Sequence, residues 1–172
     1  MKKILMMTLF AIAALAAYSQ EYVTVTVADA SGTPTNIRNA PNGKVVCQLD
    51  PDGSYTVDLI SVKNGWWKIA PEVEEWGDDE KTIPLKGSTT GYWIHSSVLD
   101  FGISGEQDNA VHVAPSEKSK LVKLSGDIFE MTFVPVAKKG QWLKFTAKSG
   151  KNTITGWIHN DRICSNPLTT CP

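Results

Sequence analysis

Apolar and polar residues alternate with a period of two along much of this chain. The clearest stretch is 22–27, which reads YVTVTV and is rich in β-branched residues, as in a half-buried strand. Short apolar runs are separated by the turn-forming pairs Asn64-Gly65 and Lys139-Gly140. Such pairs favour hairpins. We therefore predict an all-β chain, with no helix longer than about two turns after residue 20.

The second half of this pattern repeats the first. Four landmarks recur in the same order, which indicates a duplicated unit. The matched segments are 37–41 with 111–115, 55–60 with 129–134, 65–69 with 141–145, and 93–95 with 157–159. We place the first unit at 20–101 and the second, with its C-terminal tail, at 106–172. A glycine-containing hinge at 102–105 joins them. Units of this size with five or six short strands fit small, strongly bent β-barrels.

The first nineteen residues have the pattern of a signal peptide. Lys2 and Lys3 precede the apolar run 4–17, and small residues follow near Ser19. The run is too short to span a membrane, and no later segment approaches eighteen apolar residues. We expect 1–19 to be removed and the mature chain to be periplasmic or secreted, without a membrane span.

Charge is divided unevenly between the two halves of the mature chain. Residues 20–101 carry six basic and twelve acidic side chains, whereas residues 102–172 carry nine basic and six acidic ones. The total of −3 is not that of a nucleic-acid-binding protein. Opposite fields could hold the units together or orient a partner. The alternative is two unrelated surfaces.

Three cysteines remain in a compartment that permits disulfides. Cys164 and Cys171 bracket a short, turn-prone loop, so we expect a disulfide between them that fastens the tail; two free thiols are the alternative. Cys47 lies within an apolar run and is expected to be a buried strand residue.

Three motifs of the first unit occur in the order found in one known family. Residues 36–41 read NIRNAP, residues 65–69 read GWWKI, and residues 91–99 read GYWIHSSVL. This series resembles the bacterial SH3 (SH3b) family. The second unit is a divergent match, with His112 in place of the arginine. Together the two matches cover nearly all of the mature chain.

The resemblance implies two tandem small SH3-like β-barrels and a role in binding. SH3b domains are typically binding or targeting modules of wall hydrolases and other envelope proteins. We therefore expect an exported, non-catalytic binding or adaptor module that recognises cell-wall peptide or an envelope protein. The alternatives are a structural or assembly subunit of an envelope complex, and a glycan binder that uses exposed aromatic rings.

Two adjacent tryptophans in the central motif must point to opposite faces of a strand. Trp67 shares its parity with Ile69, which favours the core. Trp66 then lies on the opposite face and is a candidate contact residue; edge packing is the alternative. In the second unit Trp142 and Leu143 take the two places.

Two further aromatic residues are candidates for the same ligand site. Trp76 lies in the acidic segment 71–80, which we read as a long loop; a merely solvated loop is the alternative. Tyr92 precedes the closing strand. We expect Trp66, Trp76 and Tyr92 to border one face of the first unit.

No catalytic or cofactor site is expected. Cys47 has no partnered histidine, and His95 and His159 hold the same repeat position in separate units, as structural residues do. The three histidines also lack the short spacing of metal ligands.

Overall fold

The computed structural model describes residues 21–103, 111–124, 128, 131–149, 152–166 and 168. Within them the chain is all-β, which confirms the predicted class. No described segment forms an α-helix, and η1 (Ser96–Val98) and η4 (Asn160–Arg162) are single 3-10 turns. The signal-peptide prediction for 1–19 lies outside the described residues.

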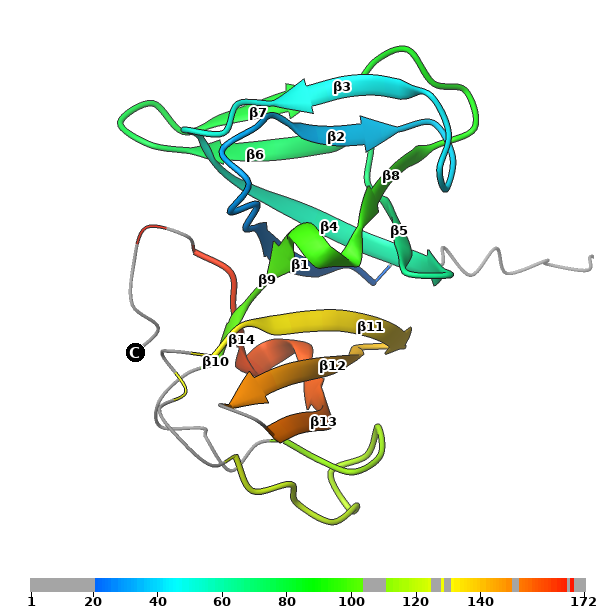
Figure 1. The fold of residues 1–172 in the computed structure, drawn as a ribbon. Helices are drawn as coiled ribbons and strands as arrows, with labels where there is room; N and C mark the ends of the chain where they lie inside the picture. Colours follow the sequence, from blue (N-terminus) through cyan, green and yellow to red (C-terminus); the bar gives the residue numbers. More distant parts are fainter. Residues whose placement is uncertain are drawn as a thin grey trace, which may run out of the picture.

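The first unit, residues 21–101, forms one large antiparallel sheet (Figure 1). Its strand order is β3-β2-β8-β5-β4-β1-β9, and β6 joins β4 and β7 beside this path. The turn between β4 and β5 has positive φ at both Asn64 and Gly65, as the Asn-Gly pair predicted. The strands are β1 (Val23–Val27), β2 (Thr35–Arg38), β3 (Val45–Leu49), β4 (Ser54–Lys63), β5 (Trp66–Ile69), β6 (Glu72–Trp76), β7 (Lys81–Pro84), β8 (Tyr92–His95) and β9 (Leu99–Asp100).

The second unit, residues 102–168, contains a three-stranded meander and a separate strand pair. The meander is β11 (Phe133–Lys139), β12 (Trp142–Ser149) and β13 (Asn152–His159). The pair is β10 (Gly102–Ile103) with β14 (Ile163–Cys164). Half of the predicted hinge at 102–105 is therefore a strand of the second unit.

The repeat seen in the sequence is present in the strand register. Trp66 pairs with His95 and Trp67 with Ile94. In the second unit Trp142 pairs with His159 and Leu143 with Ile158. Both copies then continue into a 3-10 turn and a short strand, β9 or β14, which pairs with β1 or β10. Among the described residues these pairings do not close either unit into a barrel.

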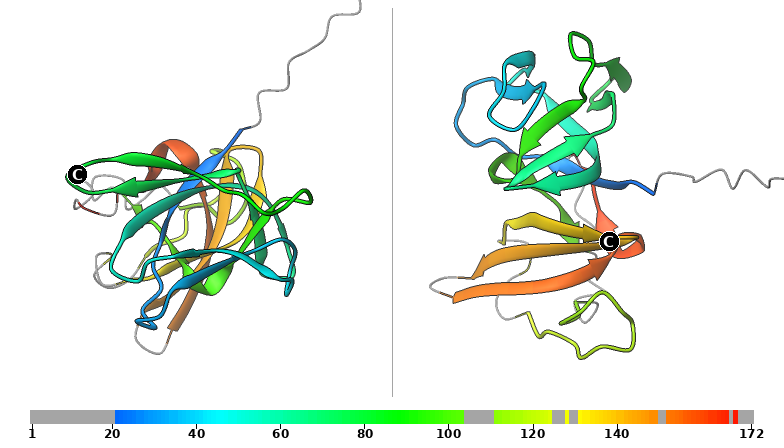
Figure 2. Two further views of the ribbon diagram at one scale, coloured as in Figure 1. Left: turned by 90° about the horizontal axis from the view of Figure 1, so that it is seen from above. Right: turned by 90° about the vertical axis from the view of Figure 1, so that its right-hand side faces the viewer.

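One continuous hydrophobic core runs through both units. Trp67 is 0% exposed, and its indole N–H donates to the Pro135 carbonyl of β11 at 3.1 Å. Phe101 packs against Phe133, with ring centroids 5.5 Å apart. Figure 2 shows the meander against the first sheet from two sides. The units are thus docked through buried side chains, and the predicted core position of Trp67 is confirmed.

Asp100, at the end of β9, fastens this junction. Its Oδ1 accepts the backbone N–H of Phe101 at 2.8 Å and that of Phe133 at 2.6 Å. Burial raises the pKa of Asp100 above its ordinary value, and the two N–H groups oppose the rise. A partly buried carboxyl group therefore connects the two units.

The acidic segment 71–80 is not the loop that we predicted. Residues Glu72–Trp76 form β6, which pairs with both β4 and β7. Val73 is buried in the core while its glutamate neighbours face outward. The run of charges thus conceals a period-two strand, because only one residue in two needs to be apolar on a one-sided sheet.

The cysteine predictions have different outcomes. Cys47 is a free thiol on β3, but it is half-buried instead of fully buried. Cys164 is disulfide-bonded. Its predicted partner, Cys171, lies outside the described residues.

Candidate functional site

Trp66 is the central residue of a cluster on the outer face of the first sheet. His95, its partner across β5 and β8, stacks edge-on with the ring centroids 5.0 Å apart. The Arg38 guanidinium of β2 lies 5.8 Å from the centre of the Trp66 ring, within the range of a cation–π contact. Three strands that are distant in sequence thus bring together a cation, an indole and an imidazole.

Neighbouring backbone holds two of these side chains in place. Arg38 donates from Nη1 to the Gly43 carbonyl at 2.7 Å. His95 caps η1: its Nδ1 accepts the Ser97 backbone N–H at 3.3 Å and lies 2.8 Å from the Ser97 hydroxyl. This pattern assigns the ring proton to Nε2, so His95 presents a donor there. The contact between Ser97 and His95 is therefore explained by helix capping.

A pocket of about 150 Å³ lies beside this cluster. We call it the Trp66 pocket. Its lining residues are Asp29, Thr35, Asn36, Arg38, Trp66, His95 and Val98.

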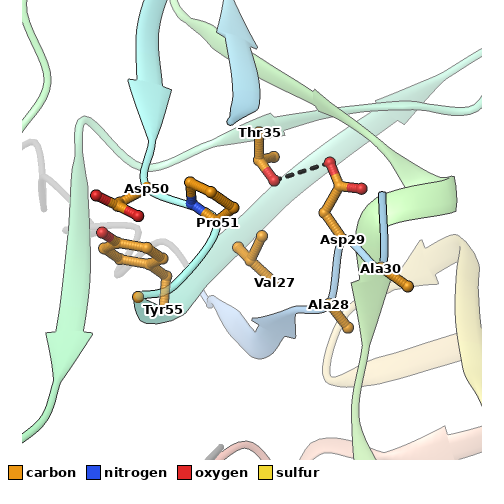
Figure 3. Close-up of a pocket in the computed structure, with 9 residues that line it drawn as sticks. Val27, Ala28, Asp29, Ala30, Thr35, Asp50, Pro51 and Tyr55 are labelled. Atoms are coloured by element: carbon orange, nitrogen blue, oxygen red, sulfur yellow. Dashed lines mark hydrogen bonds between the residues drawn. The ribbon is translucent and has the colours of Figure 1, made fainter. Parts of the chain in front are cut away.

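A larger pocket of about 290 Å³ adjoins the Trp66 pocket, because Asp29 and Thr35 line both. Figure 3 shows Tyr55 and Asp50 on one side of this second pocket and Asp29 on the other. We call the two pockets together the Trp66 groove.

Carboxylates and a guanidinium line different parts of this groove. Asp29 accepts from the Thr35 hydroxyl at 2.9 Å (Figure 3). It also accepts from the Ser31 backbone N–H at 3.1 Å. Hydrogen bonding from the Ser31 side chain is the main cause that lowers the pKa of Asp29; burial opposes it, and the Ser31 N–H and Thr35 add to the lowering. Asp29 is thus ionised at neutral pH, and the groove offers both an anion and a cation to a ligand.

The predicted ligand residues do not lie together. Tyr92 is only 7% exposed, on the core face of β8, and its hydroxyl donates to the Leu85 carbonyl at 2.8 Å. It therefore lies on the face opposite Trp66, because it pairs with the core residue Ile69. The position of Tyr92 before the predicted closing strand did not indicate burial. Tyr92 is two residues from Ile94, however, and residues two apart on a strand share a face.

Trp76 is half-buried on β6, and its indole N–H donates to the Thr56 hydroxyl at 3.1 Å. It pairs with Ser54 at one end of β4, whereas Trp66 pairs with Lys63 at the other. Their partners on β4 are nine residues apart, which corresponds to about 30 Å of extended strand. Of the three predicted residues, only Trp66 lines the groove.

Sequence reasoning missed Asp29, Thr35 and Tyr55. Asp29 lies in the turn 28–34 between β1 and β2, and Thr35 follows it as the first residue of β2; the polar segment DASGT was the available signal. Arg38 and His95 did belong to the motifs that we identified, but their contact with Trp66 depends on strand order.

The second unit contains a related cluster around Trp142. The Trp142 ring lies between His112 and His159, at centroid distances of 5.3 and 5.1 Å. His112 pairs with Trp157 as Arg38 pairs with Trp93. Glu117 and Arg162 adjoin this cluster. We call these five residues (His112, Glu117, Trp142, His159 and Arg162) the Trp142 cluster.

The chain matches no model of a known protein family, no curated protein and no solved structure. Across the described ranges, no helix has the length and hydrophobicity needed to cross a bilayer. The same part of the chain contains no group of three or more His, Cys, Asp or Glu side chains arranged to hold a metal ion.

Proposed function

We propose that this protein is an exported, non-catalytic binding module made of two SH3b-like units, and that it recognises cell-wall peptide or an envelope protein in the Trp66 groove. The observation that carries the proposal is the stack of Arg38, Trp66 and His95 beside an open pocket. The SH3b resemblance contributes these residues from three separate motifs. Their convergence at one hollow supports a shared role in recognition.

The strand connectivity also supports the SH3-like interpretation. In each unit a central strand pairs with the closing strand, and a 3-10 turn leads from there to a short final strand. The first strand of each unit pairs with that final strand. Such an arrangement suits a small bent sheet whose ends approach each other.

The glycan-binding alternative has weaker support. It required three stacking platforms, but Tyr92 is buried and the β4 partners of Trp76 and Trp66 are nine residues apart. The Trp66 ring itself is flanked by Arg38 and His95. The groove presents the opposite charges of Asp29 and Arg38, which the charged groups of a peptide can match and a neutral sugar cannot.

The test is a pull-down with the immobilised protein, using purified wall fragments and soluble envelope extract in parallel. Trp66→Ala should weaken capture by about 1 to 3 kcal/mol, as loss of an anchoring aromatic does. Trp76→Ala is the matched control, since it removes a tryptophan of the same unit that lines neither pocket. Retention by wall fragments supports wall recognition, and retention from extract supports a protein partner. Equal capture by wild type and Trp66→Ala would contradict the proposal.

A further inference from the structure

The repeat provides two copies of one site, and the second copy holds a carboxylate. Arg162 takes the place of Val98, counted from the matched landmark 157–159. Glu117 lies in the loop between His112 and Leu121, which is two residues longer than the loop between Arg38 and Val45, and the carbonyl that corresponds to that of Gly43 is that of Ser119. Glu117 meets Arg162 with its two oxygens: Nη1 lies 3.1 Å from Oε1, and both Nη1 and Nη2 donate to Oε2 at 3.2 Å. The guanidinium of Arg162 thus contacts both oxygens of the Glu117 carboxylate.

The same carboxylate also contacts the imidazole stacked on Trp142. His112 is 4% exposed and donates from Nδ1 to the Ser119 carbonyl at 3.1 Å. Its Nε2 lies 3.5 Å from Oε2 of Glu117. The second unit therefore carries its own acidic group against the residue that corresponds to Arg38.

The first unit has the cation but no carboxylate to pair with it. The corresponding loop of the first unit, 39–44, is two residues shorter and contains no Asp or Glu, and its Gly43 carbonyl occupies one N–H of Arg38. In the described part of the chain, no Asp or Glu forms an ion pair with Arg38. The remaining guanidinium donors belong to a residue that lines the Trp66 pocket.

Further donors line the same pocket. The Asn36 Oδ1 accepts from Gln48 Nε2 at 3.0 Å, which leaves the Asn36 amide N–H groups for a ligand. His95 carries its proton on Nε2, as shown by its capping contact. The volume of about 150 Å³ is several times the roughly 30 Å³ of one water molecule. A carboxylate and the carbons that bear it therefore fit.

We infer that the Trp66 pocket binds a single carboxylate of a peptide ligand, and that Glu117 in the second unit is the internal counterpart of that group. This inference rests on the proposed function. Asp29 lines the same pocket and is ionised, and the first unit has a net charge of −6. A polyacidic ligand is thereby disfavoured. The ligand that fits this pocket is a peptide with one carboxylate and a nearby amino group. The N–H groups of that amino group would donate to Asp29.

The test follows the six tryptophan indole N–H signals by NMR while short peptides are added to the purified protein. The probe is trialanine with both ends free. Three further compounds are compared with it. Trialanine amide lacks the carboxylate, N-acetyl-trialanine lacks the ammonium group, and N-acetyl-glutamate amide carries its carboxylate on a side chain. Phenylalanine variants of each tryptophan assign the signals.

Free trialanine should move the Trp66 signal, and the C-terminal amide should bind about ten- to a hundredfold more weakly, because a charge-assisted hydrogen bond is lost. N-acetylation should weaken binding less. Arg38→Gln should abolish the preference for the free acid over the amide, whereas Arg38→Lys should retain part of it. A larger response to N-acetyl-glutamate amide than to trialanine would assign the carboxylate to a side chain.

The second unit supplies an internal control. With Glu117 in place, trialanine should leave the Trp142 signal unmoved; Glu117→Gly, which removes the internal carboxylate, should make that signal respond. Equal binding of acid and amide, or an unchanged preference in Arg38→Gln that retains the wild-type spectrum, overturns the inference. The pull-down distinguishes this failure from failure of the proposed function. If capture depends on Trp66 but not on Arg38, the proposed binding function is retained and the inference that the ligand presents a carboxylate is rejected.

Discussion

The surroundings of Trp66 and Trp142 differ although the two residues begin from the same strand register. Both pair with a histidine that precedes a 3-10 turn. Around Trp66 the neighbouring arginine faces an open pocket, whereas around Trp142 a salt bridge between Glu117 and Arg162 meets a buried histidine. The same strand register is therefore compatible with an open pocket and with a site whose charged groups pair with each other. The side chains of the loop that holds Glu117 and of the 3-10 turn that holds Arg162 decide which of the two forms.

A second difference lies in how the two copies use their closing strands. Asp100 of β9 and Cys164 of β14 occupy matched positions. Asp100 binds the backbone of Phe133 and so joins the units, whereas Cys164 is disulfide-bonded. The first unit thus contributes both the open groove and a large share of the junction.

The largest expected effect tests the division between the two adjacent tryptophans. Trp67→Ala should lower the free energy of unfolding by about 3 to 5 kcal/mol, because it empties a fully buried site. It also leaves the Pro135 carbonyl without its donor. Trp66→Ala should cost much less, since its ring is half-exposed. Urea unfolding measures both, and the reverse order of losses would refute the assignment of the two faces.

A smaller loss of stability is expected at a position where the two units carry side chains of different size. Gly156 takes the place of Tyr92, and a Cβ there would collide with the Val111 side chain. Gly156→Ala should therefore destabilise the protein by about 1 to 3 kcal/mol through overpacking.

The matched control for Gly156→Ala is Tyr92→Phe. It removes only the hydroxyl, which donates to the Leu85 carbonyl at 2.8 Å and lies 3.5 Å from the Ser88 carbonyl, a loss of about 1 kcal/mol. Thermal melting of both variants gives the comparison. A stable Gly156→Ala protein would mean that Val111 can move aside.

The strands and the core were predictable because they follow from alternation. Trp67 and Ile69 share a parity, and both are buried as expected. The turn at Asn64-Gly65 was predictable because both residues adopt positive φ, and the preference for positive φ belongs to these residue types themselves. The acidic strand β6 was missed because its charges dominated the composition of the segment, although Val73 kept the period of two.

The site was predictable only in part because it depends on which strands become neighbours. Trp66 was found from parity alone. Arg38 reaches it through the pairing of β2 with β8, which no local pattern specifies. Tyr92 and Trp76 were grouped with it by closeness in sequence, but the former turns into the core and the latter pairs with the far end of β4.

A pH titration probes the junction through Asp100. Burial raises the pKa of this carboxyl in the folded protein, so the folded state binds its proton more tightly than the unfolded chain does. Its contribution to stability is therefore greatest below the ordinary value of 3.8 and declines as the pH rises through the raised folded value.

Asp100→Asn should remove this decline while keeping an oxygen for the two N–H groups. Urea unfolding from pH 3 to 7, compared between the two proteins, isolates the contribution of Asp100. A parallel pH dependence in both would show that Asp100 does not titrate differently on folding.

The smallest expected effect concerns the internal carboxylate of the second unit. Glu117→Gln removes the charge of a pair in which the Glu117 side chain is 53% exposed and the Arg162 side chain 26%. Such a pair contributes only about 0.2 to 1 kcal/mol, and salt screens it. The variant should therefore unfold at nearly the same urea concentration as wild type, with a difference that shrinks further in high salt. A loss of several kcal/mol would instead make Glu117 an essential structural contact, because the buried His112 would then depend on its charge. A small loss would show that the second site tolerates an open state like that of the first, so that the contrast between the copies reflects occupancy by a carboxylate and not a difference in fold.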